Sequence, residues 1–306
     1  MKVLVTGGAG FIGSHLVEKL VQEGCQVVVL DNLSTGVREN IPSAVNFIEM
    51  DICSDELLNI FKVENFDGVF HLAGQTMVPV SLEKPDYDCQ VNVLGTVNVL
   101  EACRKTGVKR VVFSSTAAVY GDVEGIPILE SAQTGPTSFY GLSKLTVEQY
   151  LHLYQQVFGL DYVALRYANV YGERQGDGGE GGVVSIFTRL LSQGSSLTIF
   201  GDGGQTRDFI YAGDVASANY QALFTPHVNT VYNVSTQTET SVNELIAILA
   251  KVSGTSIEKI CAPVREGDIY RSMLSNEKTT EQLGWQPLMG LAEGLERTYK
   301  HIIAMK

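Results

Sequence analysis

The sequence predicts an α/β fold, in which a doubly wound parallel sheet is accompanied by a second, smaller α/β domain. Short β-branched runs alternate with amphipathic helical stretches through the first half of the chain. Such a succession builds a parallel sheet whose ligands lie at the carboxyl ends of the strands. The 306 residues are too many for one simple core, so a large domain and a smaller one are expected. Apolar residues make up 44% of the chain and charged residues 18%, which excludes global disorder.

Five short apolar runs in the first half are predicted to be buried parallel strands. They are Lys2–Val5, Gln26–Leu30, Asn46–Met50, Gly68–Leu72 and Arg110–Ser114. Four amphipathic stretches are predicted to be helices, most of them ending near a glycine as helices commonly do. They are Gly13–Glu23, Ser54–Val63, Cys89–Lys105 and Tyr140–Phe158.

The alternation loosens after a further run at Tyr162–Arg166. The later chain is predicted to hold a glycine-rich loop, two helices and two strands, at Gly176–Gly182, Val183–Gln193, Val242–Val252, Leu197–Phe200 and Thr230–Val234. No flexible linker separates the domains, so the chain is expected to cross between them more than once. The larger domain is assigned residues 1–170 with 209–236 returning to it, and the smaller one 171–208 and 237–306.

The net charge and the cysteine content indicate which binding partners and which cellular compartment to expect. A formal charge of −12 and a pI near 4.9 argue against a nucleic-acid surface. The five cysteines are scattered without a CxxC pair, so neither a disulfide framework nor a metal site is expected. The first residues run from one lysine into a short apolar strand that breaks at glycine, which is neither a signal peptide nor a membrane span. We expect a cytoplasmic protein that binds no membrane and no nucleic acid.

A glycine-rich turn follows the first predicted strand and opens the first predicted helix. In its sequence, GGAGFIG, the glycines at 7, 10 and 13 allow a tight turn, close approach to a pyrophosphate and packing of helix on sheet. The helix N-terminus supplies N–H donors and a positive dipole. Glycine clusters alone usually mark ordinary turns, but the flanking strand and helix favour dinucleotide binding here.

Two aspartates end the next two predicted strands. Asp31, 18 residues after Gly13, is placed to accept hydrogen bonds from ribose hydroxyls and to repel a 2′-phosphate, which favours NAD over NADP. Its alternative role is that of a turn former. Asp51, with Ile52 beside it, is placed to face the adenine amino group, and its alternative role is the N-cap of the following helix.

Tyr140 and Lys144 lie four residues apart near the start of a predicted helix, so both side chains can point the same way. A free tyrosine has a pKa of about 10 and is a poor base at neutral pH. A lysine cation and an oxidised nicotinamide nearby would favour its phenolate. Ser114-Ser115-Thr116 ends a predicted strand, where hydroxyls would face the cofactor. Taken singly, each of these patterns is typical of ordinary helices and turns.

In this order, the elements resemble the extended short-chain dehydrogenase/reductase family over nearly the whole chain. The matching segments are TGGAGFIG at 6–13, DNLSTG at 31–36, HLAGQ at 71–75, NVLGT at 92–96, SSTAAVYG at 114–121, YGLSK at 140–144, RYANVYG at 166–172 and GDGGQTRDFIYAGDV at 201–215. The resemblance implies a Rossmann-type domain that binds NAD and a smaller domain that binds a nucleotide sugar. It also implies that Thr116 and Tyr140 act on the substrate hydroxyl that is oxidised, while Lys144 binds the nicotinamide ribose.

The resemblance assigns two further sets of residues. Along the dinucleotide it places Gly7, Gly10, Phe11, Ile12, Gly13, Asp31, Asn32, Ser34, Thr35, Gly36, Asp51, Ile52, Leu72, Ala73, Gly74, Asn92, Ser114, Tyr140, Lys144 and Tyr167. At the UDP-sugar it places Thr116, Asn169, Val183, Arg207, Arg265 and Asp268. The two arginines would bind the diphosphate through charge-assisted hydrogen bonds, and the alternative for each is a surface ion pair.

Two alanines bear on the reaction, which the fold alone cannot select. Dehydratases of the family carry an Asp-Glu pair just after the threonine, and here those positions are Ala117 and Ala118, which have no proton to give. The C-terminal half resembles UDP-glucose 4-epimerases, except that Glu173 stands where relatives often have proline. We therefore expect NAD-dependent epimerisation of a UDP-hexose at C4. The Tyr140 phenolate removes the hydroxyl proton, and a 4-keto sugar then turns while UDP holds it in place.

Other functions stay open at this point. One is a UDP-uronate 4-epimerase or a deoxysugar C2-epimerase, and another is an NAD-binding regulator without turnover, against which the intact Thr116, Tyr140 and Lys144 argue. Ser272 stands where relatives limited to plain hexoses carry tyrosine, so N-acetylated substrates are also expected. The apolar faces of 89–105 and 140–158 match a dimer interface in relatives and indicate a homodimer, although burial against the sheet explains many of the same residues.

Overall fold

The computed structural model describes residues 1–123, 125–176, 182–264 and 269–305. Its main feature is a seven-stranded sheet in the order β11-β6-β5-β4-β1-β2-β3, with every pairing parallel. The strands are β1 (Lys2–Thr6), β2 (Gln26–Asp31), β3 (Asn46–Glu49), β4 (Gly68–His71), β5 (Arg110–Thr116), β6 (Asp161–Tyr167) and β11 (Thr230–Val234). The predicted doubly wound parallel sheet is confirmed, and each strand lies within two residues of its expected ends.

The strand order reverses between β1 and β4, since the chain builds outward to β3 and then returns to the other side of β1. The turns that leave β1 and β4 are tied to neighbouring strand ends. The Gly7 nitrogen donates to the Leu30 carbonyl at 2.9 Å, and the Leu72 nitrogen donates to the Thr6 carbonyl at 3.1 Å. Ligands of doubly wound sheets bind outside the carboxyl ends of the strands at such a reversal. The two segments predicted to line a dinucleotide therefore meet at this edge.

Helices cover both faces of the sheet. The helices α1 (Phe11–Gln22) and α8 (Ala212–Phe224) pack together on one face, where Leu16 and Val215 are fully buried. The helices α2 (Leu57–Glu64), α5 (Gly95–Thr106) and α6 (Phe139–Phe158) pack on the other face. No helix in the described ranges is long and apolar enough to cross a bilayer.

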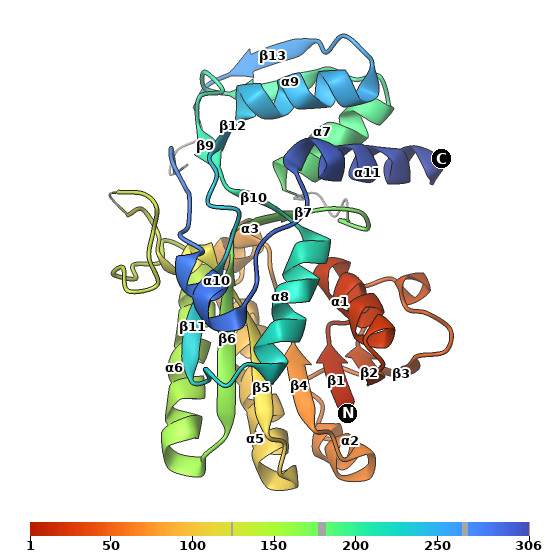
Figure 1. Ribbon diagram of the computed structural model, residues 1–306, viewed down its shortest axis with the longest axis vertical. Helices are drawn as coiled ribbons and strands as arrows, with labels where there is room; N and C mark the ends of the chain where they lie inside the picture. The colour runs from red at the N-terminus through yellow and green to blue at the C-terminus, as the bar shows by residue number, and fades with distance from the viewer. Residues whose placement is uncertain (124, 177–181, 265–268, 306) are drawn as a thin grey trace.

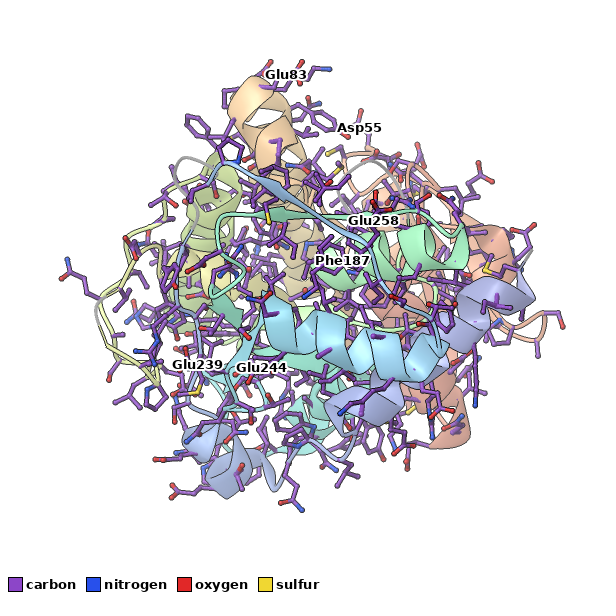
Figure 2. All side chains as sticks on the ribbon, turned by 90° about the horizontal axis from the view of Figure 1, so that it is seen from above. Asp55, Glu83, Phe187, Glu239, Glu244 and Glu258 are labelled. Atoms are coloured by element: carbon purple, nitrogen blue, oxygen red, sulfur yellow. The ribbon has the colours of Figure 1, made fainter. Side chains whose placement is uncertain are left out.

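A smaller lobe lies above the sheet in Figure 1. It contains the helices α7 (Val183–Ser192), α9 (Val242–Ser253) and α11 (Leu291–Ala304), and the strand pairs β8 (Leu197–Phe200) with β13 (Lys259–Ala262) and β9 (Thr206–Arg207) with β12 (Thr240–Ser241). The pair β7 (Asn169–Tyr171) with β10 (Phe209–Tyr211) connects it to the sheet. Figure 2 shows α9 across the front, with Glu244 near its start and Phe187 of α7 behind it in the core of the lobe.

The segment between β4 and β5 departs from its prediction. The helix expected at 89–105 is divided into a π-helix, Cys89–Leu94, and α5. Two short helices, α3 (Val78–Glu83) and α4 (Pro85–Asp88), come before it, and both carry proline in the first turn. The short 3₁₀ helices Arg38–Asn40 and Ala117–Val119 and the helices α8, α10 (Glu277–Leu283) and α11 were also not predicted.

Candidate functional site

The glycine-rich turn after β1 has no space for side chains. A Cβ on Gly7 would lie 2.6 Å from the Ala73 nitrogen, and one on Gly13 would lie 2.1 Å from the Gly7 carbonyl oxygen. Gly7 also has a φ of 70°, a conformation that favours glycine. Among the described residues, no side chain caps the start of α1, and its first turn holds no acidic residue. In the turn itself, the N–H groups of Gly7, Ala9 and Gly10 already donate hydrogen bonds to other residues of the chain. The N–H groups of Phe11 and Ile12, at the start of α1, are therefore the ones available to an anion.

Asp31 lies beside this turn at the end of β2. Its carboxylate accepts hydrogen bonds from the Ala9 nitrogen and the Leu33 nitrogen, both at 2.9 Å. The turn role considered from the sequence is therefore real, and each oxygen keeps a second lone pair for a ligand donor. Burial raises the pKa of Asp31, and the two backbone hydrogen bonds oppose that rise. Gly36 lies so close that a Cβ there would be 3.0 Å from the carboxylate.

Asn32 and Asp51 connect the ends of β2 and β3. The Asn32 amide donates to Asp51 at 2.7 Å, and Asp51 also accepts from the Cys53 nitrogen at 2.7 Å. The N-cap role considered for Asp51 is wrong, because α2 begins at Leu57 with Glu56 as its N-cap. Ile52 is buried next to Asp51, whereas Ser34 and Thr35 are exposed in the loop after β2.

Thr116, Tyr140 and Lys144 come together where β5 ends and α6 begins. The Ser138 hydroxyl caps α6 by accepting from the Gly141 nitrogen at 3.1 Å, which sets Tyr140 and Lys144 in the first two turns. The Lys144 ammonium donates to the Ser114 carbonyl at 3.0 Å and lies 4.9 Å from the centre of the Phe113 ring. The Thr116 side chain lies near enough to the Tyr140 hydroxyl to act on the pKa of that phenol.

Burial shifts the pKa values of Lys144 and Tyr140, the two residues called the Tyr140–Lys144 pair below. It lowers the pKa of Lys144 to about 8, against the opposing charge of Asp88. It raises the pKa of Tyr140, while the hydrogen bond to Thr116 acts in the opposite direction. Tyr140 is therefore a protonated phenol in the chain alone, and a positive charge brought beside it would favour the phenolate.

The remaining residues expected along a dinucleotide lie around Gly74. A Cβ at Gly74 would be 2.8 Å from the Asn92 amide oxygen and 3.4 Å from the Lys144 ammonium, so the backbone there approaches both side chains closely. Leu72 and Ala73 come just before it and are half-buried. Tyr167 is buried at the end of β6, and its hydroxyl bonds the Asn219 side chain at 3.0 Å.

Two buried titratable residues close to the Tyr140–Lys144 pair, His71 and Asp88, were not predicted from the sequence. His71 is fully buried, and its ring nitrogens bond the Thr6 hydroxyl at 2.7 Å and the Thr96 hydroxyl at 2.9 Å. Burial lowers the pKa of His71 to about 3, so the imidazole is neutral. Asp88 is only 1% exposed. The segment HLAGQ contains His71, but the sequence pattern does not distinguish a buried histidine from an exposed one.

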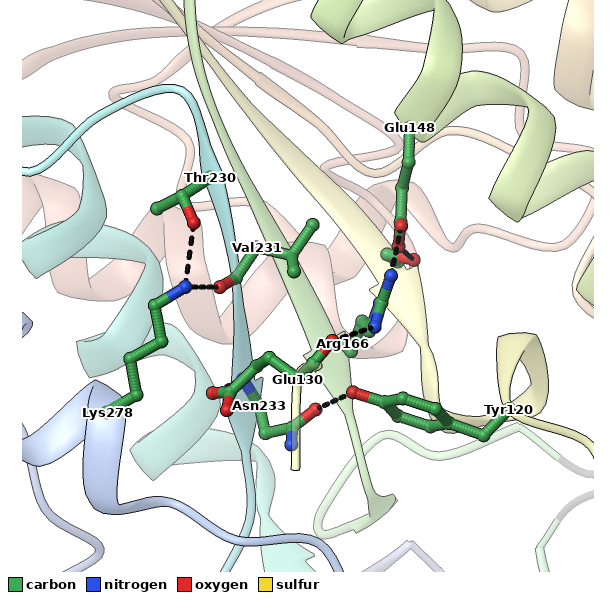
Figure 3. Close-up of polar contacts among 9 residues, drawn as sticks. Tyr120, Glu130, Glu148, Arg166, Thr230, Val231, Asn233 and Lys278 are labelled. Carbon is green, nitrogen blue, oxygen red and sulfur yellow. Dashed lines mark hydrogen bonds and ion pairs between the residues drawn. The ribbon is translucent and has the colours of Figure 1, made fainter. Parts of the chain in front are cut away.

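A buried ion pair joins α6 to the sheet behind Thr116 (Figure 3). Arg166 of β6 donates to both carboxylate oxygens of Glu148, at 2.9 and 2.6 Å, and the Ser115 hydroxyl donates to Glu148 at 2.5 Å. The guanidinium lies 4.8 Å from the centre of the Tyr120 ring, whose hydroxyl donates to Asn233 at 2.7 Å. The strand end that carries Thr116 and the helix that carries Tyr140 are thereby fixed to each other.

The residues expected at the substrate lie on the smaller lobe and its junction with the sheet. Asn169 is exposed at the start of β7, Val183 is the first residue of α7, and Arg207 lies in β9 beside β12. Arg265 and Asp268 lie outside the described residues.

Asp208, next to Arg207, was not predicted as a site residue, because the sequence motif indicated only the arginine. It is buried, and it accepts hydrogen bonds from the Thr236 nitrogen and hydroxyl, at 2.9 and 2.8 Å, and from the Gln237 nitrogen at 3.0 Å. Burial raises the pKa of Asp208 to about 6 despite these bonds. The carboxylate therefore ties together two places where the chain passes between the lobes.

Glu173 makes a side-chain contact that proline could not make. The Tyr211 hydroxyl donates to its carboxylate at 2.7 Å, and its carbonyl oxygen bonds the His15 ring at 3.0 Å. The next residue, Arg174, pairs with Glu18 of α1 at 2.5 and 2.9 Å. The loop after β7 is thus held against the helix of the glycine-rich turn.

The model of the NAD dependent epimerase/dehydratase family matches residues 3–235. The chain is 42% identical over 304 residues to a UDP-glucose 4-epimerase of Mycolicibacterium smegmatis, and 97% of each protein is covered. The UDP-glucose 4-epimerase of Thermotoga maritima, solved with UDP-glucose, superposes with a TM-score of 0.97 at 42% identity, covering 100% of this chain and 99% of that one. A UDP-N-acetylglucosamine 4-epimerase of Methanobrevibacter ruminantium superposes with a TM-score of 0.95 at 35% identity, covering 100% and 99%. The chain belongs to the NAD-dependent epimerase/dehydratase family.

Proposed function

We propose that this chain is an NAD-dependent UDP-hexose 4-epimerase, which interconverts UDP-glucose and UDP-galactose through a 4-keto sugar. The observation that carries the proposal is the meeting of Thr116, Tyr140 and Lys144 at the same edge of the sheet as the glycine-rich turn. Relatives across nearly the whole chain are UDP-glucose 4-epimerases. Ala117 and Ala118, in the 3₁₀ turn after Thr116, offer no acid for a dehydration.

The residues present fit NAD. The bare turn at Gly7–Gly13 suits a pyrophosphate, and the Asp31 carboxylate suits ribose hydroxyls and disfavours a 2′-phosphate. Gly74 approaches Asn92 and Lys144 closely, and Lys144 would bind the nicotinamide ribose there. When bound, NAD takes a hydride from the sugar carbon and returns it.

Three side chains act on the sugar hydroxyl in this proposal. Tyr140 as phenolate takes the proton from the C4 hydroxyl and later returns it, and Thr116 bonds the same oxygen. Lys144 stabilises the phenolate, and its pKa of about 8 keeps it cationic at neutral pH. Thr116 lies beside the Tyr140 hydroxyl before any ligand is bound, so little reorganisation is needed.

The nucleotide is proposed to anchor the sugar while the 4-keto ring turns. Asn169, Val183 and Arg207 would bind it together with Arg265 and Asp268, and this binding energy keeps the intermediate from leaving. We retain the division into an NAD domain, 1–170 with 209–236, and a nucleotide-sugar domain formed by the rest. The five free cysteines are typical of the reducing cytoplasm, where we place the enzyme.

Product identification with a panel of UDP-sugars tests the proposal. UDP-glucose carrying deuterium at C4 should give UDP-galactose with the label still at C4 and no solvent deuterium elsewhere in the ring. Turnover of UDP-glucuronate alone would indicate a uronate epimerase, and inversion at C2 would indicate a C2-epimerase. NAD binding without turnover of any sugar would indicate a regulator. Each of these three results overturns the proposal.

Ser272 is expected to admit N-acetylated substrates. The residue is half-buried, and a tyrosine there would fill the space beside the C2 substituent. Ser272→Tyr should lower kcat/KM for UDP-N-acetylglucosamine by about tenfold or more, since overpacking costs about 1–3 kcal/mol, while turnover of UDP-glucose persists. Ser272→Ala is the matched control and should keep both activities. Wild-type protein that turns over UDP-glucose but not UDP-N-acetylglucosamine would contradict the prediction.

We also propose a homodimer formed through the segments 89–105 and 140–158, with α6 as the main contact. This helix exposes Leu142, Leu153 and Val157 at 48, 54 and 60%, whereas the apolar residues of α5 are mostly buried under the sheet. Exposed apolar rows of this kind mark interfaces. Sedimentation velocity should give a dimer for the wild type and a monomer for Leu153→Glu. Leu288→Glu, at an exposed leucine outside α6, should leave the dimer intact, and a monomeric wild type would refute the proposal.

A further inference from the structure

Asp88 is a buried carboxylate near the catalytic pair that the chemistry above does not use. It is the last residue of α4 and is 1% exposed. One of its oxygens, Oδ1, accepts two hydrogen bonds, from the Gln75 amide at 2.9 Å and from the Asn92 amide at 3.1 Å. Both partners belong to the segments that approach the dinucleotide site.

Asp88 helps to fix the direction of the Asn92 amide. A carboxylate only accepts hydrogen bonds, so Asn92 must turn its NH₂ group toward Asp88 and its oxygen the other way. That oxygen accepts from the Gln75 nitrogen at 2.8 Å and faces Gly74. The NH₂ group also reaches the Gln75 carbonyl at 2.9 Å and the Ser143 hydroxyl at 3.1 Å. Asp88 therefore holds the Asn92 amide next to Lys144 together with the Gln75 backbone and the Ser143 hydroxyl, and it is the charged member of this set.

The charge of Asp88 also acts on the pair. It favours the cation of Lys144 against burial, and it adds to the burial that raises the pKa of Tyr140. The other ionisable groups around the pair carry little charge, since His71 is neutral and Tyr167 has a raised pKa. Farther along α6, Glu148 is paired with Arg166. The remaining titratable side chains of α3, α4 and the π-helix are exposed, namely Glu83, Lys84, Asp86, Tyr87 and Cys89.

We propose that Asp88 is a positioning residue for the Tyr140–Lys144 pair, because it binds the Gln75 and Asn92 amides beside Gly74 and supplies a buried negative charge in the surroundings of the lysine. The same charge that stabilises the lysine cation disfavours the tyrosine phenolate. Asp88 therefore raises the pKa of both Lys144 and Tyr140. The pH range in which the lysine is cationic and the tyrosine can act as a base lies higher as a result. The kinetic part of this inference rests on the proposed epimerase function.

The substitution Asp88→Asn separates charge from hydrogen bonding, because an asparagine oxygen still accepts from Gln75 and Asn92. Both limbs of the pH profile of kcat/KM should move to lower pH by about 0.5–1 unit, the size that a buried charge exerts at the effective dielectric of proteins. NAD content should stay at the wild-type level. Asp88→Ala removes the acceptor as well and should lower both kcat and NAD content. Asp86→Asn makes the same charge change at an exposed position of α4 and should leave the profile unchanged.

A titration of Tyr140, which needs no catalytic turnover, tests this inference separately from the proposed function. Ultraviolet difference spectra between each protein and its Tyr140→Phe counterpart isolate the ionisation of Tyr140 among the 13 tyrosines. In NAD-loaded protein, Asp88→Asn should shift this ionisation to lower pH even if no UDP-hexose is converted. An unshifted ionisation would overturn the charge role. Wild-type kcat and NAD content in a folded Asp88→Ala variant would overturn the positioning role.

Discussion

Replacing Tyr140 with phenylalanine is expected to lower kcat by about 10²- to 10⁴-fold, the usual contribution of a positioned general base. The aromatic ring stays, so the packing at the start of α6 and the binding of both ligands should survive. What disappears is the hydroxyl that lies beside Thr116 and that removes the sugar proton in the proposed reaction. A loss in kcat with little change in KM indicates an interaction made in the transition state. Steady-state kinetics of UDP-glucose conversion measure the kcat and KM of the variant.

The matched control is Tyr150→Phe, which removes a hydroxyl from the same helix at a residue that is 38% exposed. This variant should keep the wild-type kcat. NAD released from both variants by denaturation should equal the wild-type amount, which would separate loss of the base from loss of the cofactor. Full activity of Tyr140→Phe would refute the assignment of the base.

The sheet could be predicted because buried parallel strands differ sharply from their surroundings. In β1 and β5, the apolar runs VLV and VVF show no polar alternation, as burial on both faces requires. Helix α8 could not be predicted in this way, because its packing uses buried polar groups. Asn219 bonds Tyr167, and Asp214 accepts from the Met289 nitrogen at 2.9 Å. Apolar periodicity alone does not reveal such a helix.

The π-helix at Cys89–Leu94 was missed for a different reason. The apolar pattern continues across it into α5, so nothing in the spacing marks a change of helix type. In the structure, the Thr96 hydroxyl donates to the Asn92 carbonyl at 2.5 Å and also bonds His71. The irregular turn therefore coincides with polar contacts to a neighbouring strand, which is information the local sequence does not contain.

Motifs located the residues that line the edge of the sheet, but not the buried groups behind them. The glycine-rich turn, Asp31 and Tyr140 belong to short segments whose spacing carries a physical reason. His71, Asp88 and Glu148 are ordinary residue types until their partners are known. Those partners lie 65 positions away for His71 and Thr6, and 33 for Glu148 and Ser115. Only the folded chain shows that such polar side chains are buried and paired.

Truncation of Glu148 to alanine is expected to lower the free energy of unfolding by about 3–5 kcal/mol, the cost of leaving a buried charge without its partner. The side chains of Arg166 and Glu148 are 6 and 7% exposed. Burial works to lower the pKa of Arg166, but the hydrogen bonds to Glu148 outweigh it and hold the pKa above its ordinary value. Without Glu148, the partners that the guanidinium keeps in the described part of the chain are the Glu130 carbonyl, at 3.3 Å, and the Tyr120 ring (Figure 3). Urea unfolding followed by circular dichroism measures the loss.

Removal of both charges should be less damaging than removal of one. Glu148→Ala combined with Arg166→Met leaves no buried ion, so the double variant should recover part of the stability that Glu148→Ala loses. Glu293→Ala breaks the exposed pair with Arg297 and should hardly move the unfolding midpoint, because exposed pairs contribute little. If Glu148→Ala were as mild as Glu293→Ala, the polar contacts of Glu148 with Arg166 of β6 and Ser115 of β5 would not be what fixes α6 to the sheet. The placement of Tyr140 beside Thr116 would then depend on apolar packing alone, and Glu148→Ala would leave kcat unchanged.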